Sequence, residues 1–299
     1  SSVPTSYNVA AVVQPSVATD SQHEGDKEVG KEATAEPTET VFREATGTSG
    51  FRNSGEVTSR VVSNWNGFVS ALNDNSIQNI TISGNVVATG DNGNTDNGRV
   101  NSVDRTVAIN SQGRNVVIQG RNDQAGLDLL SNSLKFTGSS AWNLVFKNLQ
   151  LATGNSKGAV DLSSTTGANT VTFENVKSQG SSLYGGGGNT DVIVKGETSS
   201  TVSDSYRSAN GQTQYVQRNV GSAGHSVLRR EANIHDAKSV TVADGASLTL
   251  NRSSQGDGIN LAGGSTVRVN DGASLTINMN TNNGTESARY HNAGIFMEH

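Results

Sequence analysis

The chain has 299 residues, of which 34 are Gly, 3 are Pro and none is Cys, while hydrophobic residues make up 32% and aromatic residues 5%. This length is enough for one large domain or two modest ones, and a composition so rich in small polar residues argues against a helical bundle. The absence of Cys excludes disulfides, thiolate metal sites and Cys nucleophiles. No apolar run approaches the roughly 18 residues that cross a bilayer, and the first residues lack the pattern of a secretory signal. We therefore expect a mature or excised piece that does not insert into a membrane.

The net charge of −5 is concentrated at the start of the chain, because residues 1–50 hold eight acidic residues against Lys27, Lys31 and Arg43. The rest of the chain is close to neutral and has no bulk attraction for nucleic acid, which we expect to bind only non-specifically at low pH. Residues 1–50 also hold all the prolines and few large apolar side chains. We expect them to form an acidic lead-in segment, docked or free, ahead of a ligand-binding domain over 51–299.

The local patterns predict one helix followed by strands. A capping Ser or Asn precedes Trp65, Phe68 and Leu72, whose spacing of three and four residues predicts a short amphipathic helix. From Ile77 onward, short runs of Val, Ile and Leu with period two alternate with Gly, Asn, Asp and Ser. This pattern predicts strands and turns to the end of the chain.

An internal repeat indicates how these strands are arranged. Residues 240–251 read VTVADGASLTLN and residues 267–278 read VRVNDGASLTIN, with nine identities at an interval of 27 positions. A unit of about 27 residues fits one coil of a parallel β-solenoid, whose inward side chains stack from coil to coil. We expect the predicted helix to cover the N-terminal opening of the stack. Four pairs should stack one coil apart: Val240 on Val267, Val242 on Val269, Leu248 on Leu275, and Leu250 on Ile277.

Several segments in order resemble the pectate-lyase-like adhesive domain in the binding regions of lactobacillus serine-rich repeat adhesins. The resemblance covers about residues 60–299, and the segments are NWNGFVSALND with IQNITISGNV, RTVAINSQGRNVVIQG, NLVFKNLQL, NTVTFENV and the DGASLT repeat. It implies an all-β, right-handed parallel β-helix with a short N-terminal capping helix. It also implies a non-catalytic domain on a bacterial cell surface, anchored through regions outside this fragment. We expect no cofactor and no metal site. The implied partner is an acidic polysaccharide such as pectin, or a host mucin glycan, bound best at acidic pH.

Two other classes of function remain as alternatives. Pectate lyases of this fold resemble one another in Trp-x-x-Asp-His and Arg-x-Pro-x-x-Arg segments, whereas Trp65 and Trp142 are followed by NGFVS and NLVFK, and no proline follows Pro37. A polygalacturonase needs paired carboxylates; residues 189–191 (NTD) match its first motif, but its Asp-Asp pair is missing. We therefore expect no enzymatic activity. The other alternative is a structural module that associates with itself in biofilm.

Candidate binding residues gather in and before a long interval, 197–237, which exceeds any turn that the solenoid needs. Long loops on rigid scaffolds commonly carry binding sites, Arg grips carboxylates with two parallel hydrogen bonds, and Tyr rings stack on sugars. Basic and aromatic residues of the preceding coils would extend the same face into a groove for a linear polymer. Alternatively these are solvated charges, with Arg229 and Arg230 paired to Glu231 and Asp236. The predicted ligand-binding residues are Lys177, Tyr184, Lys195, Tyr206, Arg207, Tyr215, Arg218, His225, Arg229 and Arg230.

Overall fold

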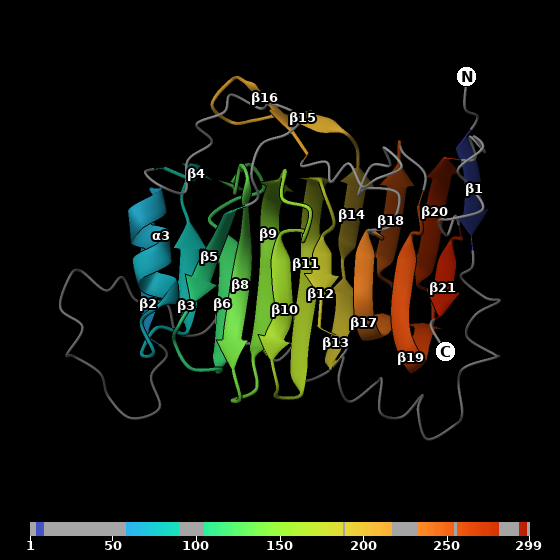
Figure 1. Cartoon of the computed structure of the whole chain (residues 1–299), viewed down its shortest axis with the longest axis horizontal. Helices are drawn as coiled ribbons and strands as arrows, with labels where there is room; N and C mark the ends of the chain where they lie inside the picture. The colour runs from blue at the N-terminus through green and yellow to red at the C-terminus, as the bar shows by residue number, and fades with distance from the viewer. Residues whose placement is uncertain are drawn as a thin grey trace, which may run out of the picture.

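The computed structural model describes residues 4–8, 58–89, 105–187, 189–216, 232–253, 256–280 and 293–297. Within these residues, a 19-stranded sheet winds into a parallel β-solenoid whose coils stack along the long axis of the molecule (Figure 1). The predicted all-β parallel solenoid is confirmed.

Each coil contributes strands to three faces, which the chain visits in the same order in every coil. The first face holds β2 (Ser59–Val62), β3 (Asn79–Ile82), β6 (Asn115–Gly120), the first halves of β9 (Asn143–Thr153) and β11 (Asn169–Gly180), β13 (Thr190–Lys195), and the second halves of β17 (Ile234–Val242) and β19 (Ile259–Val269). The second face holds β4 (Asn85–Val87), β7 (Gly126–Asp128), the second halves of β9 and β11, β14 (Glu197–Val202), β18 (Ser247–Arg252) and β20 (Ser274–Asn280). The third face holds β5 (Arg105–Ile109), β8 (Asn132–Gly138), β10 (Val160–Thr165), β12 (Tyr184–Gly186), the first halves of β17 and β19, and β21 (Ile295–Met297).

The core is a stack of inward side chains, one layer per coil. The four predicted pairs are in register, since Val240 lies beside Val267, Val242 beside Val269, Leu248 beside Leu275, and Leu250 beside Ile277. All eight side chains are fully buried. The rings of Phe146 and Phe173 also stack across adjacent coils, with 5.6 Å between their centroids. The prediction from the repeat is therefore confirmed.

The predicted helix is α3 (Trp65–Leu72), and it lies at one end of the solenoid beside β2 and β3 (Figure 1). The side chain of Asn64 caps it by accepting a hydrogen bond from the backbone N of Gly67 at 2.8 Å. Trp65, Phe68 and Leu72 are buried against the first coil. The predicted N-terminal capping helix is confirmed. No helix in the described ranges is long and apolar enough to span a membrane.

The opposite end of the solenoid carries β1 (Pro4–Asn8), which pairs antiparallel with β20 and adds a strand to the second face. The beginning of the predicted lead-in segment therefore docks as extended chain on the outer edge of β20 (Figure 1). The rest of residues 1–50 lies outside the described residues.

The bends between the first and second faces explain part of the high Asn content. Asn148 and Asn175 have positive φ angles of 52° and 53°, a left-handed conformation that Asn tolerates. The Asn175 amide donates to Asn148 Oδ1 at 3.3 Å, one coil away. In the next coil Gly196 follows with φ 59°, and Asn175 Oδ1 accepts from the backbone N of Glu197 at 2.9 Å. Asn148, Asn175 and Gly196 therefore form the same bend in three successive coils.

Candidate functional site

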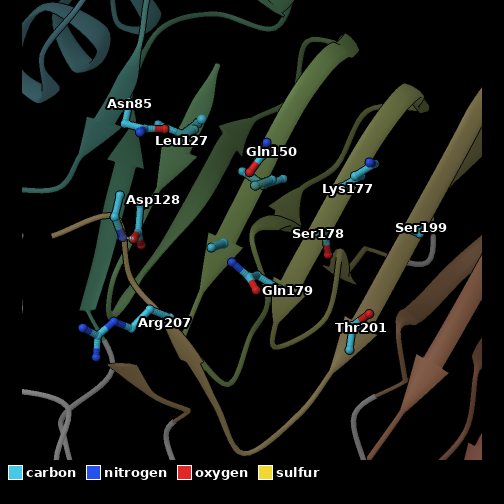
Figure 2. A pocket seen from close by; sticks show the side chains of 14 residues that line it. Asn85, Leu127, Asp128, Gln150, Lys177, Ser178, Gln179, Ser199, Thr201 and Arg207 are labelled. Atoms are coloured by element: carbon cyan, nitrogen blue, oxygen red, sulfur yellow. Dashed lines mark hydrogen bonds between the residues drawn. The ribbon is translucent and has the colours of Figure 1, made fainter. Parts of the chain in front are cut away.

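A groove of about 470 Å³ crosses the second face of the solenoid (Figure 2). Residues of β4, β7, β9, β11 and β14 line it, together with residues of the chain that follows β14. Neighbouring strands lie about 4.8 Å apart, so these strands measure roughly 19 Å along the solenoid axis. The groove therefore crosses several coils and has the orientation that an extended polymer would need to contact all of them.

The floor of the groove presents amide and hydroxyl side chains in regular rows. Gln150 lies beside Lys177, and Lys177 beside Ser199, because parallel register places equivalent positions of successive coils next to one another. Gln179 and Thr201 form the adjacent row. Such side chains both donate and accept hydrogen bonds, which is the pattern that sugar hydroxyls require.

A hairpin forms one border of the groove, and in sequence it is an insertion between β14 and β17. Its strands, β15 (Ser205–Arg207) and β16 (Thr213–Tyr215), pair with each other antiparallel and lie beyond the edge of the solenoid (Figure 1). The hairpin packs on two glycines: a Cβ at Gly154 would lie 2.6 Å from the carbonyl O of Tyr215, and one at Gly180 would lie 2.9 Å from the Tyr206 ring. We call residues 205–215 the docked hairpin.

Asp128 joins the docked hairpin to the floor. Its Oδ1 accepts hydrogen bonds from the Tyr206 hydroxyl at 2.6 Å and from the backbone N of Leu130 at 3.0 Å. Its Oδ2 accepts from the backbone N of Ala209 at 2.9 Å. Burial raises the pKa of Asp128 above its usual range, although these donors oppose the shift, and burial also raises the pKa of Tyr206. Both oxygens of this carboxylate are therefore occupied within the protein.

Two cations border the groove, Lys177 from β11 and Arg207 from the docked hairpin, and Figure 2 shows them on separate sides of it. Both side chains are exposed. Among the residues that the structure describes, neither has an ion-pair or hydrogen-bond partner. The lining holds two cations, Lys177 and Arg207, against one carboxylate, Asp128, so its local potential favours an anion.

The structure separates the predicted binding residues into groups. Lys177 and Arg207 line the groove, Tyr206 is buried and bonds Asp128, and Tyr215 is 37% exposed on β16 but is not part of the lining. Tyr184 and Lys195, which the sequence placed on the binding face, are buried and lie outside the groove lining. Four others lie outside the described residues: Arg218, His225, Arg229 and Arg230.

The burial of Tyr184 and Lys195 has a common physical cause, the position of each residue within its coil. Tyr184 is on the third face, beside the core positions Val160 and Ile234, so its ring is fully buried and its hydroxyl donates to the carbonyl O of Gly187 at 2.9 Å. It cannot stack on a sugar at the surface. Lys195 ends β13 on the first face and is only 5% exposed. Neither residue extends the groove.

Sequence reasoning missed Asn85, Gln150, Gln179, Ser199 and Thr201, which line the groove. The signal was available in part, because Gln150 precedes Lys177 by one repeat interval of 27 positions. The interval from Lys177 to Ser199 is shorter, so the repeat alone does not place Ser199 in the same row.

Asp191, the carboxylate of the candidate hydrolase motif, lies on β13 of the first face and accepts a hydrogen bond from the Ser239 hydroxyl. It is not part of the groove lining. In the described part of the chain, no group of three or more His, Cys, Asp and Glu residues is arranged to hold a metal ion.

The fold and the groove together define a class, a parallel β-solenoid with a polar groove across one face. Residues 59–184 match the family described as "putative pectate lyase-like adhesive domain", in agreement with the resemblance seen in the sequence. The matched region includes the floor of the groove from β4 to β11, whereas β14 and the docked hairpin follow it. The chain has no significant match among curated proteins.

Two solved structures of serine-rich repeat proteins (SRRPs) share this fold. The SRRP of L. reuteri 53608 is 22% identical with a TM-score of 0.52, over 68% of this chain and 62% of that chain. The SRRP of L. reuteri 100-23 is 16% identical with a TM-score of 0.51, over 73% of this chain and 57% of that chain. The present chain thus spans less than two thirds of either structure. At these identities the likeness shows the fold alone.

Proposed function

We propose that this chain is a non-catalytic adhesin domain, displayed outside a bacterial cell, that binds an acidic polysaccharide of the pectin or polygalacturonate type in the groove. The observation that carries the proposal is the pair Lys177 and Arg207, two exposed cations without partners among the described residues, beside a carboxylate that is already engaged. Acidic host mucin glycans present the same chemistry and are the second class of ligand.

The proposed mode of binding combines ionic contacts with hydrogen bonds. Arg207 would bind a uronate carboxylate through two parallel N–H donors, and Lys177 would act as a point charge further along the polymer. Gln150, Gln179 and Ser199 would exchange hydrogen bonds with sugar hydroxyls on the floor. Each contact is exposed to water and weak by itself, so affinity would depend on several sugar units binding together.

The proposal includes stronger binding in acid. The chain has a net charge of −5 with its five His neutral, so protonating the His and then part of the carboxylates makes the protein cationic between pH 7 and about pH 4. Uronate carboxylates stay largely ionised over this range, so attraction would grow as the pH falls.

The groove lining also supports a non-catalytic role. Hydrolysis of a glycosidic bond by the common mechanism needs two carboxyl groups on either side of that bond. The lining contains one carboxylate, Asp128, and its two oxygens bind Tyr206, Leu130 and Ala209.

The proposal is tested by titrating polygalacturonate onto the intact chain at pH 4 to 5 and comparing two sets of variants. The double variant Lys177→Ala with Arg207→Ala should lose at least tenfold in affinity. Lys238→Ala is the matched control, because Lys238 is an exposed cation on β17 that does not line the groove. Equal affinity of the double variant and the wild type would refute the assignment of the groove.

A further inference from the structure

The docked hairpin has no strand pairing with the solenoid. β15 and β16 form a two-stranded sheet of their own, separate from the 19-stranded sheet. An isolated two-stranded hairpin is marginally stable in water, so contacts other than backbone ladders must hold it in one place. The backbone N of Val216 donates to the carbonyl O of Asp204 at 2.9 Å, which closes the base of the hairpin but does not fix its direction.

Besides its packing on Gly154 and Gly180, the hairpin makes hydrogen bonds to a more distant coil. The chain leaves the solenoid after β14, yet the Tyr206 hydroxyl and the backbone N of Ala209 both donate to Asp128, which ends β7. β7 is separated from β14 by β9 and β11, a distance of roughly 14 Å at the usual strand spacing. Tyr206 and Asp128 are 78 positions apart in sequence. The hairpin therefore lies back across earlier coils, beside the groove.

Arg207 lies between these two anchoring points. Successive side chains of a strand point to opposite faces, so Tyr206 points toward the solenoid and is 6% exposed while Arg207 points outward and is exposed. Figure 2 shows Asp128 and Arg207 on the same side of the groove. Fixing Tyr206 on one side and Ala209 on the other leaves the backbone of Arg207 little freedom to move.

We infer that Asp128 and Tyr206 are positioning residues, whose hydrogen bond holds the docked hairpin on β7 and thereby places the Arg207 guanidinium at the groove for an anionic ligand. This inference rests on the proposed function of the groove. A cation held in place before binding loses less conformational freedom when the ligand binds, so the hydrogen bond raises affinity without touching the polysaccharide.

The inference is tested by a double-mutant cycle in the intact chain, read as affinity for polygalacturonate. Tyr206→Phe keeps the ring that packs on Gly180 and removes only the hydroxyl. We expect Tyr206→Phe and Arg207→Ala each to lower affinity about tenfold, and the double variant to bind no more weakly than Arg207→Ala. Lys177→Ala is the control background: Lys177 is on β11, outside the hairpin, so Tyr206→Phe should still lower affinity about tenfold there.

A second measurement does not depend on the ligand. Amide hydrogen exchange at Ala209 should speed up at least tenfold in Tyr206→Phe and in Asp128→Asn, while exchange in β9 stays as in the wild type. Should the wild type fail to bind polygalacturonate, the proposed function fails while the exchange data still decide whether the hydrogen bond holds the hairpin. Unchanged exchange in both variants would overturn the inference. It would also be overturned if Tyr206→Phe lowered affinity as much in the Arg207→Ala background as it does in the wild type.

Discussion

Replacement of Leu248 by Asp tests the register of the solenoid. Leu248 is fully buried, and it lies beside Thr198 in one adjacent coil and Leu275 in the other. Truncating a fully buried Leu to Ala typically costs about 3 to 5 kcal/mol. Asp adds a buried polar group without a partner, which costs about 1 to 3 kcal/mol more. We therefore expect Leu248→Asp to lower the free energy of unfolding by about 5 kcal/mol, a large part of the total stability of an ordinary domain.

The neighbouring residue provides the matched control. Thr249 is half-buried on the outward side of the same strand, beside Ser199 and Thr276. Thr249→Asp should change the free energy of unfolding by less than about 1 kcal/mol. Urea denaturation followed by circular dichroism measures both values, and Leu248→Ala, at about 3 kcal/mol, replaces the Asp variant if that protein cannot be purified. Equal destabilisation by Leu248→Asp and Thr249→Asp would refute the assignment of inward and outward positions.

Three further outcomes follow, two from the groove and one from a charged group beside the capping helix. Affinity for polygalacturonate should rise from pH 7 to pH 4. It should fall with added salt, because exposed charges are screened within about 8 to 10 Å. An affinity that changes neither with pH nor with salt would contradict the electrostatic account. Incubation with polygalacturonate, with or without calcium, should release neither unsaturated products nor new reducing ends. Ser76 hydrogen bonds hold the pKa of Asp74 below its usual value, so they stabilise the fold above about pH 4 and lose this effect as the pH falls. The stability difference between wild type and Ser76→Ala, measured by urea unfolding, should therefore shrink below pH 4.

The sequence was sufficient to predict the features that repeat. Nine identities at a fixed interval placed Val240, Val242, Leu248 and Leu250 in register with the next coil. This works because each coil buries its apolar side chains at equivalent positions against the coil beside it. The capping helix was equally visible, since Trp65, Phe68 and Leu72 share one helical face.

The site was harder to predict because it depends on departures from the repeat. The first-face positions Val192 and Val240 are adjacent in space, but the docked hairpin lies between them in sequence and interrupts the 27-residue interval. Tyr184 lies 24 positions after its third-face neighbour Val160 and 50 before Ile234, so a 27-residue interval did not reveal its inward orientation. Nothing local to Tyr206 indicates that its partner is Asp128, since the contact exists only once the hairpin lies back on β7.

A crystal structure of the chain with an oligogalacturonate at pH 4 to 5 would test the central claim most directly. The account predicts that the oligosaccharide lies along the groove across β7, β9, β11 and β14, with uronate carboxylates at Lys177 and Arg207. An oligosaccharide bound on another face, with the groove empty, would contradict it.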